Sequence, residues 1–208
     1  MGVKKMNKDK LIKALEDRGF SAKYFGNRDE AVNYLKDSIR NKTIGIGGSE
    51  TIKEIGLDKV LEENNKVFWH WNKSLVEEKG IKGARDLATD TEIYITSVNG
   101  VSEEGTLINI DGSGNRISST AYGHEKVYFI IGRNKVEENF EKALFRARNV
   151  AAPKNAQRLK KKTPCAVKGD KCYDCKSPER ICRGFMIIER AMSSMEMEVV
   201  IIDEDLGM

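Results

Sequence analysis

Two amphipathic helices are predicted from the spacing of apolar positions near the start of the chain. The first ends at Gly19, because glycine readily adopts the left-handed conformation that follows many helix C-termini. The second begins after Asn27, which forms a capping-box pattern with Glu30. Their apolar stripes consist of Leu11, Ile12 and Leu15 in the first helix and of Ala31, Leu35 and Ile39 in the second.

Short runs of β-branched and aromatic residues alternate with the helical patterns and continue beyond them. Such runs, bounded by turn-forming residues, are typical of strands. The predicted strands cover residues 22–25, 43–46, 67–69, 93–96, 127–131, 185–188 and 198–202. Strands that alternate with helices belong to parallel βαβ units, so the pattern predicts an α/β fold with a parallel sheet.

The pattern changes in the middle of the chain. Two β-rich stretches, residues 106–110 and 116–119, flank a Gly- and Asp-rich spacer at 111–115, which is typical of a hairpin. A long helix is then predicted over residues 135–148. Its apolar stripe consists of Phe140, Ala143, Leu144 and Ala147. All three prolines fall in the next stretch, at positions 153, 164 and 178, so this stretch is expected to be irregular.

Composition limits the classes of protein to which the chain can belong. With 208 residues and 39% hydrophobic content, we expect a single domain over residues 1–208, with a Cys-rich insertion at 160–184. The net charge of +4 is too small and too dispersed to indicate nucleic-acid binding. No apolar run approaches the ~20 residues of a membrane helix, and Lys4 and Lys5 precede no apolar signal segment. A cytoplasmic location with reduced thiols is therefore expected.

Four cysteines in one short stretch are the most informative candidates for chemistry. Cys165, Cys172, Cys175 and Cys182 have the spacing Cys-x6-Cys-x2-Cys-x6-Cys, and the chain contains no other cysteine. Thiols gathered in this way favour a metal or iron–sulfur site over scattered core positions. Residues 160–184 are therefore predicted to be a metal-binding segment.

The spacing of the cysteines leaves more than one centre open. Structural zinc sites usually pair two Cys-x2-Cys units, whereas iron–sulfur ligation tolerates a single unit flanked by lone cysteines. An iron–sulfur cluster, of the 4Fe-4S type, is the preferred interpretation, with zinc or free redox thiols as alternatives. The basic residues at 160–162, with Arg180 and Arg183, would offset the charge of a thiolate-bound centre. Such a run is also common on solvated loops.

A glycine-rich sequence lies where the predicted strand 43–46 turns into a helix. Gly47 and Gly48 let backbone N–H groups approach an anion, and Ser49 or Thr51 can donate a hydroxyl. The sequence contains neither the dinucleotide-binding glycine pattern nor the P-loop. It therefore indicates either a phosphate or carboxylate cradle or a tight turn in which Ser49 caps the helix.

Two adjacent carboxylates follow the predicted strand 93–96. Glu103 and Glu104 stand between glycines, beyond the carboxyl end of the strand, where ligands gather in open α/β sheets. One of them could act as a nucleophile or general base, or both could belong to a solvated turn. A second polar cluster consists of Asn109, Asp111, Asn115 and Arg116, and Asx turns would explain its first three members.

The two histidines argue against a histidine-based zinc hydrolase. His70, between Trp69 and Trp71, is expected to be half-buried structure, because no second histidine or carboxylate shares its spacing. His124 is expected to be a surface turn residue, with a catalytic role as the less favoured interpretation.

Several of these motifs, taken in order, resemble the LUD-domain family. The matching stretches are GGSET at 47–51, SEEGTL at 102–107, NIDGSGNR at 109–116, GRNK at 132–135 and RNVAAP at 148–153. The resemblance is to the LutC-like group, named for lactate utilization, and covers nearly the whole chain.

The resemblance implies a Rossmann-like sheet of the ribose-5-phosphate isomerase and coenzyme A transferase type. In that superfamily it places ligand binding at Gly47, Gly48 and Ser49. It maps the nucleophilic glutamate of a Ser-Glu-x-Gly motif to Glu103. LutC-like proteins are associated with the conversion of lactate to pyruvate alongside iron–sulfur partner proteins, although the four-cysteine segment is not required of every such protein.

We therefore expect a LUD-type protein of organic-acid redox metabolism that binds a small anionic metabolite and an iron–sulfur cluster. Iron–sulfur redox proteins are candidate partners and a homo-oligomer is a candidate assembly. The alternatives are a metal-stapled ligand-sensing or assembly module and a non-redox transferase or isomerase. Either Glu103 or Glu104 is expected to face the Ser49 loop, with Arg116 or Lys53 as its cationic partner.

Overall fold

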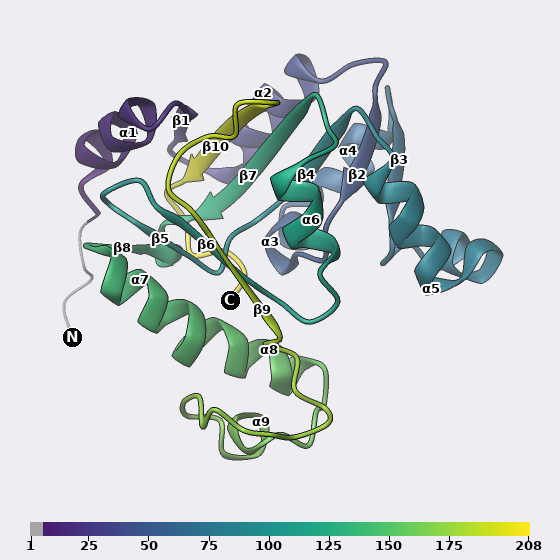
Figure 1. Cartoon of the computed structure of the whole chain (residues 1–208). Coiled ribbons are helices and arrows are strands. Elements are labelled where there is room, and N and C mark those ends of the chain that lie inside the picture. Colours follow the sequence, from purple (N-terminus) through teal and green to yellow (C-terminus); the bar gives the residue numbers. More distant parts are fainter. Residues whose placement is uncertain (1–5) are drawn as a thin grey trace.

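The centre of the molecule is a six-stranded parallel sheet with the strand order β1-β10-β7-β4-β2-β3 (Figure 1). The computed structural model describes residues 6–208, so Lys4 and Lys5 lie outside the described part. All five pairs of neighbouring strands are parallel. The strands are β1 (Ser21–Phe25), β2 (Thr43–Ile46), β3 (Lys66–Trp69), β4 (Ile93–Thr96), β7 (Lys126–Gly132) and β10 (Glu196–Ile202). The predicted α/β class and these predicted strands are confirmed.

A second, four-stranded sheet has the order β8-β5-β6-β9. Its strands are β5 (Gly100–Ser102), β6 (Leu107–Asp111), β8 (Val136–Glu137) and β9 (Gly184–Ile188). One hydrophobic cluster contains Phe129 and Val199 of the central sheet together with Val101 and Leu107 of the small sheet. The two sheets therefore share one core.

Helices cover both faces of the central sheet. On one face, α2 (Arg28–Ser38), α3 (Glu50–Glu54) and α4 (Leu57–Glu62) pack against β2, β4, β7 and β10. The other face carries the small sheet with α1 (Lys8–Asp17), α5 (Lys73–Thr89) and α6 (Asn115–Ala121). Gly45 shows how closely α5 approaches the sheet, because a Cβ at this position would lie 1.9 Å from the Ala88 carbonyl oxygen.

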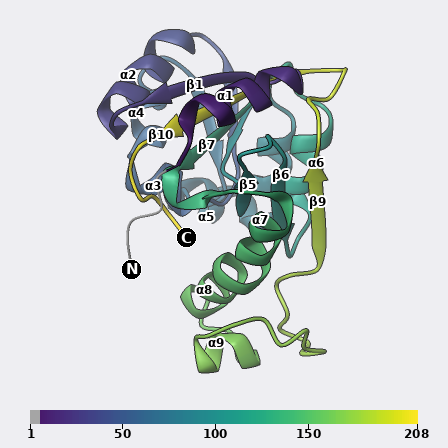
Figure 2. The same ribbon diagram turned by 90° about the vertical axis from the view of Figure 1, so that its left-hand side faces the viewer.

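A long helical rod lies on the outer face of the small sheet. It consists of α7 (Phe140–Arg146), a π-helical turn (Ala147–Ala151) and α8 (Ala152–Arg158). Ile108 and Ile110 of the small sheet pack against Ala143, Ala147 and Ala152 of the rod. Figures 1 and 2 both show α9 (Pro164–Lys168) and the cysteine segment at the end of this rod, away from the central sheet.

Two predicted elements are wrong. Residues 116–119 form part of helix α6 and not a hairpin strand, because Gly114 takes a φ of 86° and Asp111 accepts the Arg116 backbone N–H at 2.9 Å. The helix predicted from residue 135 begins at Phe140, where Asn139 caps it by accepting the Lys142 N–H at 3.0 Å. The rod then continues beyond residue 148 through Pro153, which the first turn of α8 tolerates.

Within residues 6–208, no helix combines the length and apolar character needed to cross a membrane.

Candidate functional site

A cavity of about 210 Å³ lies at the carboxyl edge of the central sheet. Its walls include segments that directly follow strands: Gly48 and Ser49 after β2, His70 after β3, Ser97 after β4 and Lys135 after β7. Strand β3, which follows β2 in the chain, lies on one side of β2. Strands β4, β7 and β10, which come later, lie on its other side. Open α/β sheets bind ligands at such a switch point, so this is the candidate site.

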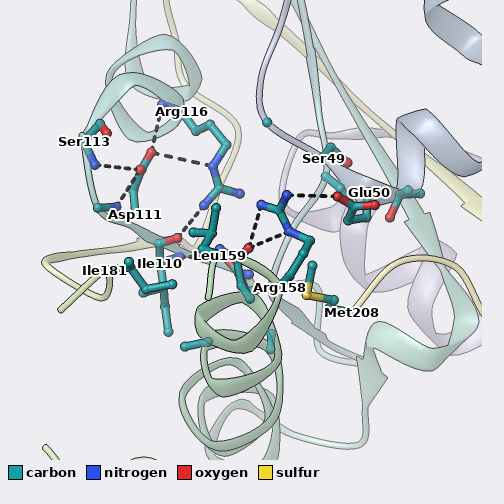
Figure 3. Close-up of a pocket in the computed structure, with 18 of the residues that line it drawn as sticks. Ser49, Glu50, Ile110, Asp111, Ser113, Arg116, Arg158, Leu159, Ile181 and Met208 are labelled. Carbon is teal, nitrogen blue, oxygen red and sulfur yellow. Dashed lines mark hydrogen bonds and ion pairs between the residues drawn. The ribbon is translucent and has the colours of Figure 1, made fainter. Parts of the chain in front are cut away.

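The remaining walls come from the small sheet and the surrounding helices. Figure 3 shows Arg116 with Asp111 on one side of the cavity and Arg158 with Glu50 on the other. Ile181, from the cysteine segment, also lines it. The charged side chains that line the cavity are Arg85, Arg116, Lys135 and Arg158 and the carboxylates Glu50 and Asp111. Cations therefore outnumber carboxylates.

Asp111 holds the turn that presents Arg116. Its carboxylate accepts the backbone N–H groups of Gly112 at 2.7 Å, Ser113 at 3.1 Å and Arg116 at 2.9 Å, and lies 3.6 Å from the Arg116 Nε. Burial raises the pKa of Asp111, but Arg116 and these backbone hydrogen bonds outweigh burial, so the pKa lies below its ordinary value. Asp111 thus positions Arg116 and neutralises part of its charge.

Arg158 is held on the opposite wall by a carboxylate and an aromatic ring. Its NH1 lies 3.2 Å from Glu50 Oε1, and its guanidinium lies 4.9 Å from the centre of the Trp71 ring. A guanidinium over an aromatic face is stabilised by the ring quadrupole. The side chain is therefore fixed at the cavity and its charge is partly neutralised by Glu50.

Lys135 is a buried cation without a carboxylate partner. The residue is 4% exposed, and its Nζ donates to Thr51 Oγ1 and Ser97 Oγ, both at 2.7 Å. No ion pair joins it to a carboxylate among residues 6–208. Burial, with the nearby Arg146 and Arg116, lowers its pKa to about 7, although Glu54 acts in the opposite direction. The amine is therefore partly charged near neutral pH.

Two polar atoms at the cavity have no hydrogen-bond partner in the described part of the chain. They are Arg85 Nε and His70 Nδ1, both buried. Burial, with the nearby Arg85 and Arg116, lowers the pKa of His70 to about 4, although Asp111 acts in the opposite direction. His70 is thus a neutral ring at pH 7, and it lies at the cavity as a partly buried residue.

Most of the residues predicted to bind a ligand come together here. Those that line the cavity are Gly48, Ser49, Thr51, Asp111, Asn115 and Arg116. Ser49 also caps α3, since its Oγ accepts the Ile52 N–H at 3.4 Å. Gly47 is packed behind the cavity, and its N–H donates to the Ile95 carbonyl at 3.0 Å. The Gly47 amide is therefore used within the protein and does not point to a ligand.

The structure places Glu103 and Glu104 elsewhere. Glu103 accepts the Asn7 backbone N–H at 3.0 Å and lies 3.4 Å from Lys10 Nζ, while the carbonyl of the exposed Glu104 accepts from Arg18 at 2.6 Å. The two glutamates thus contact α1 and its N-cap, and neither lines the cavity. A catalytic role for either one stays a prediction, and it would act outside this cavity.

Two other candidates are core residues. Asn109 is 1% exposed, does not line the cavity, and its side-chain atoms have no hydrogen-bond partner among the described residues. The prediction of a surface position for His124 is wrong. Its ring stacks on Tyr94 with centroids 5.0 Å apart, and Nδ1 lies 2.7 Å from the Thr91 carbonyl. The polar neighbours of His124 in the sequence did not reveal this packing.

The sequence and the fold both match known proteins. A model of the LUD domain matches residues 8–202. The chain belongs to the LUD-domain family. The fold of this LUD domain is similar to that of a DUF162 family protein from Deinococcus radiodurans, with a TM-score of 0.52 and 11% identity, over 95% of this chain and 99% of that one. Among proteins of curated function, none matches the sequence.

A weaker likeness to eIF2B delta from Chaetomium thermophilum has a TM-score of 0.37 and 16% identity. It covers 65% of the LUD-domain chain and 54% of that protein, and the TM-score is too low to support an argument.

All four cysteines of the LUD-domain chain border a second, smaller cavity, together with Arg148 and Arg180. Thr163 Oγ1 lies 3.3 Å from Cys165 Sγ, and the Asp174 N–H donates to Cys172 Sγ at 3.4 Å. No three His, Cys, Asp or Glu side chains among residues 6–208 are close enough together to hold a single metal ion. The thiols therefore converge on one place.

Sequence reasoning missed several residues of the LUD-domain site. Ser97 directly follows the predicted strand 93–96, and that position could have identified it. Lys135 stands at the start of a predicted helix, which obscured its position beyond β7. Arg85 and Arg158 lie on helices. The sequence around a helical arginine does not show whether its side chain faces solvent or a cavity. Only the folded chain brings these two side chains to the switch point.

Proposed function

We propose that this LUD-domain protein binds a small organic-acid anion at the switch-point cavity and carries an iron–sulfur cluster on its four cysteines. Its role would be that of a component in organic-acid redox metabolism of the lactate type, with iron–sulfur proteins as partners. Membership of the LUD-domain family supports this role at the level of the family. The expected relation to the ribose-5-phosphate isomerase and coenzyme A transferase folds is part of the same proposal.

The main support for anion binding is the surplus of positive charge at the cavity. Arg116 and Arg158 have carboxylate partners, whereas Lys135 and Arg85 have none among the described residues. A buried cation without a counterion is costly, and a bound anion removes that cost. The ligand that best complements these walls therefore carries negative charge.

The size of the cavity favours a small ligand. At about 210 Å³ it is smaller than the roughly 300–1,000 Å³ of pockets for drug-sized molecules. Besides the cations, the walls offer the hydroxyl of Ser97, the amide of Asn155 and the neutral ring of His70. These groups suit a short carboxylic acid with a hydroxyl or carbonyl oxygen next to its carboxylate, the class that includes lactate and pyruvate.

The cluster half of the proposal is supported by the convergence of the thiols. A single zinc ion with Zn–S bonds of about 2.3 Å draws its sulfur ligands to within about 4 Å of one another. A cluster spaces its thiolates more widely, and the four cysteines around one cavity could supply its ligands. A bound cluster would supply one-electron redox chemistry.

Titration calorimetry of the anaerobically purified protein tests whether the cavity binds an organic-acid anion, with L-lactate, pyruvate and inorganic phosphate as probes. We expect a carboxylate probe to bind, and Arg85→Gln to weaken its binding at least tenfold. Lys82→Gln is the matched control, because Lys82 lies on the same helix, its side chain is 89% exposed and the substitution removes the same charge. Absence of binding by any carboxylate, or equal effects of the two variants, would contradict the proposed site.

Iron, sulfide and zinc analysis of the same sample tests whether the four cysteines hold an iron–sulfur cluster. Iron and sulfide in comparable amounts are expected. Zinc at one atom per chain with no iron would instead favour a metal-stapled ligand-sensing module, and would leave the anion site untouched.

A further inference from the structure

The ligand cavity and the cysteine cavity share a wall. Ala152 and Ile181 line both of them, and Ile181 is followed directly by Cys182. Helix α8 lies between the two cavities, with Asn155 and Arg158 toward the ligand and Pro153 and Ala156 toward the cysteines. One layer of small and apolar side chains thus separates a bound anion from a centre on the thiols.

Two arginines, Arg148 and Arg180, border the cysteine cavity, and both lie 3.1 Å from the Asp174 carboxylate. Arg180 donates to the backbone carbonyls of Cys175 at 2.8 Å and of Cys182 at 2.9 Å, and Arg148 lines the same cavity. The N–H group of Asp174 points at Cys172 Sγ from a left-handed backbone with a φ of 45°. These features suit a centre that carries net negative charge, because cations and N–H groups near the sulfurs stabilise added electrons.

We infer that the two cavities are thermodynamically linked: an anion in the ligand cavity lowers the reduction potential of the cluster on the four cysteines, and reduction of the cluster weakens binding of that anion. The inference rests on the proposed function. The redox step adds one electron to the cluster from an external one-electron donor such as dithionite, and the anion itself is unchanged. Linkage requires both effects to have the same size.

The physical cause is repulsion across the shared wall. The Ala152 and Ile181 side chains supply no charge to screen an anion from the cluster, and interactions through a protein interior are stronger than through water. Couplings between linked sites are typically about 5- to 150-fold. We expect the reduced protein to bind the anion about tenfold more weakly, which for a one-electron couple corresponds to a potential about 59 mV lower.

Lys135 makes the linkage depend on pH. With a pKa of about 7, its amine is mostly charged at pH 6, so binding adds one negative charge to the cavity. At pH 8 the amine is mostly neutral, and an anion that draws a proton onto Lys135 adds little net charge. His70, with a pKa of about 4, and Arg146, with a pKa of about 10, keep their charge states over this range. The other charged groups that face Lys135 or the cavity are Arg85, Arg116, Arg158, Glu50, Glu54, Asp111 and the carboxylate of Met208, the last residue of the sequence.

Potentiometric titration of the cluster-loaded protein, monitored by electron paramagnetic resonance, tests the inference. The midpoint potential is measured with and without a saturating carboxylate probe, L-lactate or pyruvate, at pH 6 and pH 8. We expect a lower potential with the probe at pH 6 and a smaller change at pH 8. Arg85→Gln and Lys135→Met, which weaken binding, should raise at least tenfold the probe concentration that gives half of this change, whereas Lys82→Gln should leave that concentration unaltered.

The outcomes separate the inference from the proposed function. A potential that is unchanged by a saturating probe, in protein that binds both the probe and the cluster, overturns the linkage alone. Protein that binds no carboxylate, or that contains no iron, overturns the corresponding half of the proposed function and the linkage with it. A potential raised by the probe contradicts the repulsion that we infer.

Discussion

Replacing Lys135 by methionine should stabilise the ligand-free protein while it weakens anion binding. Burial lowers the pKa of Lys135 from 10.5 to about 7, so the folded chain holds its proton less tightly than the unfolded chain does. A difference of about 3.5 units corresponds to a destabilisation of about 5 kcal/mol when the amine is charged. The variant also loses the hydrogen bonds to Thr51 and Ser97, which reduces the gain in stability by about 1–3 kcal/mol. A net gain of about 2–4 kcal/mol is expected at pH 6.

The sign of the pH dependence follows from the same pKa. The destabilisation is complete below the folded pKa of about 7, and it disappears as the pH rises toward the unfolded value of 10.5. The advantage of Lys135→Met should therefore be largest at pH 6 and should vanish by about pH 10, where only the lost hydrogen bonds remain.

Urea denaturation of the ligand-free protein at pH 6, 8 and 10, followed by circular dichroism, measures this difference. Lys82→Met serves as the control, since its side chain is 89% exposed and a change within about 0.5 kcal/mol is expected. The reasoning is refuted if Lys135→Met is less stable than the unmodified protein at pH 6, or if the difference between them does not change with pH.

Three further outcomes are expected. As the pH rises from 7 to 9, the affinity for a carboxylate probe should fall by up to about tenfold per pH unit, because Lys135 loses its proton. An affinity that calorimetry finds unchanged over this range would contradict a role for Lys135 in binding. Gly45→Ala should cost more than about 3 kcal/mol in urea denaturation, because its Cβ would lie 1.9 Å from the Ala88 carbonyl, whereas Gly26→Ala, with contacts no closer than 3.6 Å, should cost less than about 1 kcal/mol. Glu103→Gln should leave probe affinity unchanged, and a tenfold loss would show that Glu103 belongs to the site.

The sequence predicted the strands of the central sheet well, because most of them (β2, β4, β7 and β10) are short, largely buried runs bounded by polar or turn-forming residues. Thr43–Ile46 and Ile93–Thr96 have the predicted bounds. Prediction failed where a helix lacks a clear apolar stripe. Helix α5 (Lys73–Thr89) has Gly80 and Gly83 in its interior and only Ala84 and Ala88 buried, so its pattern resembles that of a polar loop.

The polar half of the site shows a second limit of sequence reasoning. Asp111 and Arg116 were recognised as site candidates from their local density, but the same stretch was predicted to be a hairpin. Ile117 suits a strand by propensity, but Asp111 accepts the backbone N–H groups of Arg116 and Ile117 across the glycine turn, and these hydrogen bonds favour a helix. Arg85 carries no such local signal, since its role depends on how α5 packs.

Helix α1 and the residue that follows it attach the small sheet to the rest of the fold. Arg18 donates to the carbonyls of Glu104 and Glu189, Lys10 lies beside Glu103, and the apolar side of α1 is buried in the core that both sheets share. The small sheet is thereby fastened to the central sheet before any ligand arrives. The binding that we propose would then need little rearrangement of the backbone, and little of the binding free energy would be lost in ordering the site. Its association rate would depend on the attraction of the cationic walls for an anion in solution, which weakens as ionic strength rises.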